Sequence, residues 1–85
     1  MKIEYLIEQI NVSDDDYELS ERYMKSSDKI KIGDVMFSYE SSKADFEVES
    51  NHDGYIYFNE NYKIGDMLKV GSVVCVITDK LIKFS

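Results

Sequence analysis

Lys43 is the residue with the clearest chemical possibility, because two short runs rich in apolar residues flank it, Val35 to Tyr39 and Phe46 to Val48. Two such runs separated by a few polar residues are typical of a β-hairpin. Glycines lie ten residues before Lys43, at Gly33, and eleven residues after it, at Gly54. The pattern predicts that Lys43 lies at a hairpin tip with its ε-amine clear of the fold, where an enzyme could modify it.

The other residues that could take part in catalysis or metal binding are isolated. His52 is the only histidine, and it lies in a polar stretch without a nearby nucleophile or second ligand, so we expect it to be solvated. Cys75 is the only cysteine and lies in the apolar run Val73 to Ile77, which favours a buried, unreactive thiol without a disulfide partner. The carboxylates lack the spacing of a calcium loop. The sequence therefore predicts neither an enzyme active site nor a metal site.

Composition predicts one folded domain that spans residues 1–85. Apolar residues make up 44% of the chain and aromatic residues 13%, which is too much for a disordered segment. The net charge of -7 argues against binding to nucleic acid, which requires a basic face. No run has the length of a membrane helix, and the start of the chain is too acidic for a secretory signal, so we expect a cytoplasmic protein without membrane contact.

The first quarter of the chain has mixed periodicity. Ile3, Tyr5 and Ile7 alternate as in a strand, yet Ile3, Leu6 and Ile10 also match helical spacing. The segment from Tyr17 to Met24 is equally mixed. Periodicity alone does not choose between a helix and a strand in these segments.

An internal repeat runs through the chain with a shift of 38 residues. The segment Asp28 to Val35 recurs as Asp66 to Val73, and the same shift places Tyr17 on Tyr55. A unit of this size is too small to bury its own apolar face, so the repeat predicts two similar halves that close on each other with pseudo-twofold symmetry.

The four glycines are expected to be structural. Gly33 and Gly71 are equivalent in the repeat, and each precedes an apolar strand, which is consistent with a tight turn at positive φ. Gly54 and Gly65 are also interpreted as turn residues. A shorter echo, Lys31 to Asp34 and Lys63 to Asp66, is shifted by 32 residues and extends no further, so we interpret it as chance.

These glycines and Lys43 together give the chain a resemblance to the lipoyl/biotinyl attachment domain family, lipoyl type. The family pattern runs Gly-Asp, a short apolar strand, Glu-x-x-Lys-Ala, Glu-Val, a glycine, a second Gly-Asp and an apolar-Gly pair. The matching residues here are Gly33-Asp34, Glu40-Ser41-Ser42-Lys43-Ala44, Glu47-Val48, Gly54, Gly65-Asp66 and Val70-Gly71. The chain departs from the pattern in having Ser42 where aspartate is more common, Ser27-Asp28 where many members have a further Gly-Asp, and no proline before Gly54.

The resemblance implies an all-β fold, a flattened barrel or sandwich of two small antiparallel sheets, and it favours strands for both ambiguous segments. It implies that Lys43 carries lipoate in amide linkage, attached by a lipoate ligase or lipoyl transferase that recognises the hairpin through Glu40, Ser42 and Ala44. It also implies that the loop after the first strand lies near the hairpin, so that Asp14, Asp15 and Asp16 would help partner enzymes to recognise the carrier.

The function that follows from the resemblance is a free-standing, non-catalytic lipoyl carrier. The lipoyl group would pass acyl groups or electrons between a decarboxylase, an acyltransferase and a dihydrolipoyl dehydrogenase on separate chains. A biotin carrier is the first alternative, although biotinyl domains usually have methionine on both sides of the lysine, whereas this chain reads Ser42-Lys43-Ala44. An unmodified adaptor of the same fold is the second alternative, and the sequence leaves both open.

Overall fold

The structure, a computed structural model, describes residues 2–7 and 17–81, and these residues form eight strands and no helix. The strands are β1 (Lys2–Leu6), β2 (Tyr17–Arg22), β3 (Lys29–Ile30), β4 (Val35–Glu40), β5 (Asp45–Glu49), β6 (Gly54–Phe58), β7 (Met67–Leu68) and β8 (Val73–Thr78). The predicted all-β class is confirmed. Strands, not helices, form in both ambiguous segments.

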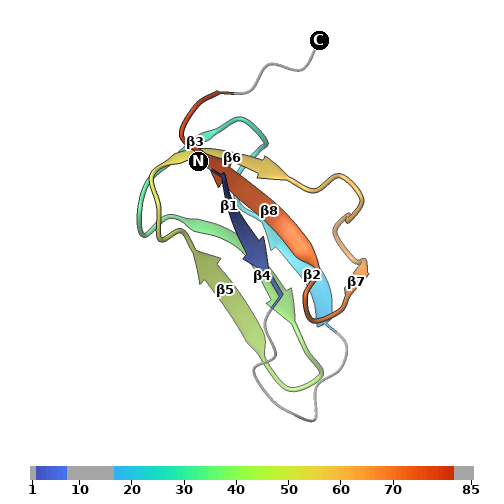
Figure 1. The fold of residues 1–85 in the computed structure, drawn as a ribbon. Coiled ribbons are helices and arrows are strands. Elements are labelled where there is room, and N and C mark those ends of the chain that lie inside the picture. The colour runs from blue at the N-terminus through green and yellow to red at the C-terminus, as the bar shows by residue number, and fades with distance from the viewer. Residues whose placement is uncertain (1, 8–16, 82–85) are drawn as a thin grey trace.

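The strands make two four-stranded antiparallel sheets (Figure 1). The first sheet has the order β1-β8-β6-β3 and the second has the order β5-β4-β2-β7. The core lies between them, because its fully buried side chains come from both sheets, among them Leu19 and Phe37 of the second sheet and Ile56 and Ile77 of the first. The molecule is therefore a small sandwich of two sheets, as expected.

The 38-residue repeat corresponds to the symmetry of the two sheets. A shift of 38 residues carries β3 onto β7 and β4 onto β8 with identical bounds. Each strand of the first sheet has a counterpart in the second: β5 for β1, β4 for β8, β2 for β6 and β7 for β3. Exchanging each strand for its counterpart turns the order β1-β8-β6-β3 into β5-β4-β2-β7, which is the order of the second sheet. The predicted pseudo-twofold arrangement is confirmed.

Four turns of one design flank β3 and β7. They are Lys25–Asp28, Lys31–Asp34, Lys63–Asp66 and Lys69–Ser72. In each turn the N–H of the last residue donates to the carbonyl of the first, and the side-chain oxygen of the last accepts from the N–H of the first. The third residue has a positive φ: 76° at Ser27, 94° at Gly33, and 93° at both Gly65 and Gly71. The 32-residue echo joins two of these turns, so its interpretation as chance is wrong.

Replacing Gly33 or Gly71 by valine is expected to lower the free energy of unfolding by about 1–3 kcal/mol, because a branched side chain is strained at positive φ. An ideal Cβ at either position meets no atom within 4 Å, so backbone strain alone acts. Denaturant unfolding measures the loss. Ser27→Gly is the matched control, and it should raise stability because it relieves the same strain. Losses below a few tenths of a kcal/mol at both glycines would contradict the turn assignment.

Gly54 differs from its predicted role. It is the first residue of β6, not a turn residue, and an ideal Cβ there would lie 2.3 Å from the carbonyl oxygen of Thr78 and 2.9 Å from Cγ2 of Ile77. The close approach of β6 to β8 therefore requires a glycine at this position.

Candidate attachment site

Lys43 lies in the turn that joins β4 to β5. The Ser41 N–H donates to the Ala44 carbonyl at 2.9 Å and closes the turn around Ser42 and Lys43. The Lys43 N–H in turn donates to the Ser41 hydroxyl at 3.2 Å. The side chain of Lys43 is exposed, as are Ser42 and Ala44 on either side of it. The predicted hairpin is confirmed, and its turn presents the lysine to solvent on a hydrogen-bonded backbone.

Aromatic packing fixes the base of this hairpin to the core. Tyr39 of β4 lies opposite Phe46 of β5, with ring centroids 5.3 Å apart. On the other side Tyr39 meets Tyr17 edge to face, also at 5.3 Å. Edge-to-face and offset aromatic pairs stabilise a fold beyond the area they bury. The turn therefore projects from a packed aromatic base only a few residues from Lys43.

The hairpin lies at one end of the sandwich. In Figure 1 the β4–β5 turn is at the bottom, whereas the beginning of β1 and the end of β8 lie at the top. Lys2 pairs with Thr78 at that upper end. Lys43 is therefore remote from the places where the first described strand begins and the last one ends.

Carboxylates form a row across the sheet beside the turn. Glu18, Glu40 and Asp45 are cross-strand neighbours on β2, β4 and β5. The main cause that raises the pKa of Glu40 above its usual value is its side-chain hydrogen bond with Asp45, in which the protonated Glu40 carboxyl donates to the Asp45 carboxylate, and Glu18 adds to the effect. Glu40, one of the expected recognition residues, thus belongs to an acidic strip next to Lys43.

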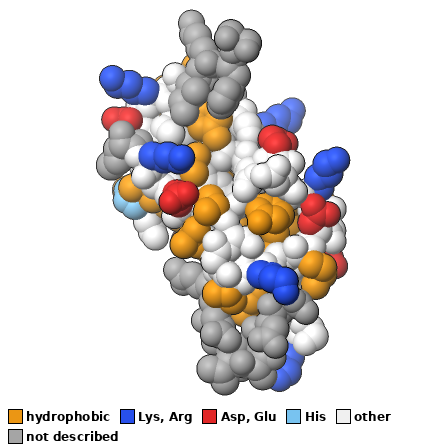
Figure 2. All heavy atoms as spheres, turned by 45° about the vertical axis from the view of Figure 1, so that its right-hand side comes forward, with side chains coloured by type: hydrophobic (Ala, Val, Ile, Leu, Met, Phe, Trp, Pro, Cys, Tyr) orange, Lys and Arg blue, Asp and Glu red, His pale blue; other side chains and the backbone are white. Residues whose placement is uncertain are grey.

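Basic side chains do not gather in one place on the face seen after a 45° turn from the view of Figure 1. On the face that Figure 2 shows, Lys and Arg side chains are spread around the rim and interspersed with Asp and Glu. Phosphate backbones are bound by a continuous basic patch or stripe. This face does not have that character.

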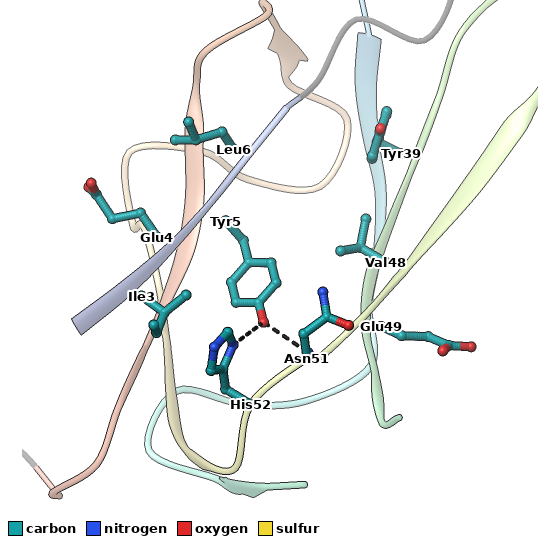
Figure 3. A pocket seen from close by; sticks show the side chains of 9 residues that line it. All are labelled: Ile3, Glu4, Tyr5, Leu6, Tyr39, Val48, Glu49, Asn51 and His52. Atoms are coloured by element: carbon teal, nitrogen blue, oxygen red, sulfur yellow. Dashed lines mark hydrogen bonds between the residues drawn. The ribbon is translucent and has the colours of Figure 1, made fainter. Parts of the chain in front are cut away.

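A groove lies between β1 and β5, with a volume of about 370 Å³ (Figure 3). Tyr5 and His52 meet in it, with the Tyr5 hydroxyl 3.2 Å from His52 Nδ1. The Asn51 N–H also donates to the Tyr5 hydroxyl, at 2.9 Å. His52 is half-buried, so the expectation that it is solvated is wrong. No sequence signal predicted this pair, because its members are 47 positions apart.

The structure also bears on Cys75 and on the predicted absence of metal and membrane sites. Cys75 is 1% exposed, which confirms the predicted burial, and this burial raises the pKa of its thiol to about 12. Within residues 2–7 and 17–81, no three His, Cys, Asp or Glu side chains are placed to hold a metal ion. No membrane-spanning helix is found in that part of the chain. Asp14, Asp15 and Asp16 lie outside the described residues.

Comparisons of this chain with protein-family models and with curated proteins find no match.

Proposed function

We propose that this chain is a non-catalytic carrier domain and that Lys43 receives lipoate in amide linkage. The observation that carries the proposal is the position of Lys43, exposed in a closed two-residue turn at one end of a pseudo-twofold β-sandwich. A packed base with an exposed lysine at its tip suits a carrier, because the base would fix where the arm starts while the arm itself stays able to move.

The chemistry would belong to the cofactor and to the partner enzymes. A ligase or transferase would bring lipoate as an activated acyl group. The Lys43 Nζ would form the amide bond as the bond to the activating group breaks and a proton is released. The disulfide of the lipoyl ring would then accept acyl groups or electrons, while this chain orients and presents the ring.

The proposed system resembles a 2-oxoacid dehydrogenase. A decarboxylase would load the arm, an acyltransferase would unload it and a dihydrolipoyl dehydrogenase would reoxidise it. A cytoplasmic location belongs to the same proposal. Glu40, Ser42 and Ala44 surround Lys43 within the hairpin, which supports their role as the surface that the attachment enzyme contacts.

Incubation of the purified chain with a lipoate ligase, lipoate and ATP is expected to add the mass of one lipoyl group. Peptide mapping should place that group on the fragment that contains Lys43. A parallel incubation with a biotin ligase, biotin and ATP should add nothing. Addition of biotin but not lipoate would replace the lipoyl assignment by a biotin carrier, and no addition in either reaction would contradict the carrier function.

A further inference from the structure

The outer edge of β5 has no neighbouring strand in the described part of the chain. β5 ends the second sheet and β1 ends the first, and each has five residues. The other two sheet edges, β3 and β7, have only two residues each. A five-residue edge is long enough to accept a strand from another molecule.

Backbone hydrogen bonds show which amides of β5 point outward. Just beyond the strand, the Ser50 N–H donates to the Asp34 carbonyl at 2.8 Å, on the side of β4. Before the strand, the Ala44 carbonyl accepts from Ser41 on the same side. The direction of the backbone N–H and C=O groups alternates along an antiparallel strand. In β5 these groups therefore point toward β4 at the even-numbered residues and toward the open edge of the sheet at the odd-numbered residues.

The residues of β5 whose backbone N–H groups point toward the open edge are all acidic. They are Asp45, Glu47 and Glu49, and their side chains are exposed. The residues between them, Phe46 and Val48, are half-buried and pack against the core. Val48 also lines the groove between β1 and β5 (Figure 3). A strand added to this edge would thus meet a carboxylate at every second position on one face and apolar side chains on the other.

We propose that the β5 edge binds an extended segment of a partner protein in which basic and apolar residues alternate. Backbone hydrogen bonds to the odd-numbered amides would hold the segment in register. Its lysines or arginines would lie opposite Asp45, Glu47 and Glu49, where cross-strand pairs of opposite charge are favourable. Its apolar residues would lie next to Phe46 and Val48, on the face of the sheet that packs against the core and borders the groove.

Charge also excludes two other arrangements. A second copy of this chain paired through β5 would set carboxylates opposite carboxylates, which is destabilising. The β1 edge carries Lys2, Glu4 and Leu6 on its exposed positions, so it offers no uniform charge to a basic segment. The acidic edge is therefore suited to a different chain with the opposite charge.

The bound segment would lie beside the lysine turn, since Asp45 is only two residues from Lys43. The inference does not depend on lipoylation of Lys43. It holds equally for an unmodified domain, so the unmodified chain serves for the test.

The test titrates the chain with a synthetic peptide of alternating lysine and valine and follows the backbone amides by NMR. The largest shifts are expected at the three odd-numbered amides of β5. We expect binding about tenfold tighter than for a peptide of the same composition with its lysines contiguous. N-methylation of the peptide amides that face β5 should abolish the difference.

Two charge-matched variants complete the test. The triple variant Asp45→Asn, Glu47→Gln, Glu49→Gln should lose about tenfold in affinity at 0.15 M salt, where the Debye length is about 8 Å. The control triple variant Asp28→Asn, Glu60→Gln, Asp79→Asn removes the same charge from exposed positions in loops next to the first sheet and should lose much less. Asparagine at position 28 keeps an oxygen that can accept the Lys25 N–H. Equal losses in both variants, shifts centred on β1, or insensitivity to N-methylation would overturn the proposal.

Discussion

Lys43→Arg is expected to abolish lipoylation while leaving the fold unchanged. Arginine keeps the positive charge and a similar length, but its guanidinium stays protonated and is no substitute for a nucleophilic amine. The side chain is exposed at the tip of a turn, so its replacement should change the free energy of unfolding by less than about 0.5 kcal/mol. Intact-mass spectrometry after incubation with ligase, lipoate and ATP gives the result directly.

Lys80→Arg is the matched control for this prediction. Lys80 is also exposed, and it lies just beyond β8, the strand that corresponds to β4 in the repeat. This variant should accept one lipoyl group at the rate of the unchanged chain. A lipoyl group that is still added to the Lys43→Arg variant would show that the turn lysine is not the attachment residue.

The hairpin could be predicted because its strand and turn signals are local, and the repeat because each of its two copies is a short segment that can be compared directly in the sequence. A strand such as Val35–Glu40 is marked by a run of apolar residues, and a turn such as Lys63–Asp66 by a glycine followed by an aspartate whose carboxylate caps the turn. Each signal spans fewer than ten residues, so it survives in the sequence without knowledge of the fold. Ser27-Asp28, which stands where the family pattern often has Gly-Asp, forms the same turn, with Ser27 at a φ of 76°.

The opening segment could not be assigned from its own residues. Its strand is decided by pairing with β8, where Ile3 lies opposite Ile77 and Tyr5 opposite Cys75. These partners are about seventy positions away. When a pattern of apolar residues fits both a helix and a strand, the structure that forms depends on which partner strand or surface the segment can pack against in the fold.

The polar contacts between the two sheets could not be predicted from the sequence either. Arg22 reaches from β2 to the opposite sheet, where its guanidinium lies 5.0 Å from the ring centroid of Phe58 and donates to the Tyr62 carbonyl. His52 meets Tyr5 across the groove. Sequence composition gives no hint of either contact, because each depends on the stacking of the two sheets.

Gly54→Ala is expected to lower the free energy of unfolding by about 3 kcal/mol or more, the upper part of the range for overpacked sites. The added methyl would lie 2.3 Å from the Thr78 carbonyl oxygen, a backbone atom of a strand that is paired on both sides. A flexible side chain could move aside, but β8 could shift only by disturbing its pairing with both β1 and β6.

Gly65→Ala separates this steric effect from the general cost of replacing a glycine. Gly65 has a φ of 93°, and an ideal Cβ there meets no atom within 4 Å, so its replacement should cost only about 1–2 kcal/mol of backbone strain. Urea unfolding of the two variants compares them, and protease resistance serves if Gly54→Ala does not fold. A domain of this size has a total stability of only about 4–13 kcal/mol, so a loss of about 3 kcal/mol is a large share of it and should be evident as a clearly lower urea midpoint for Gly54→Ala than for Gly65→Ala. If Gly54→Ala lost no more stability than Gly65→Ala, β6 and β8 would not approach as closely as the structure has them.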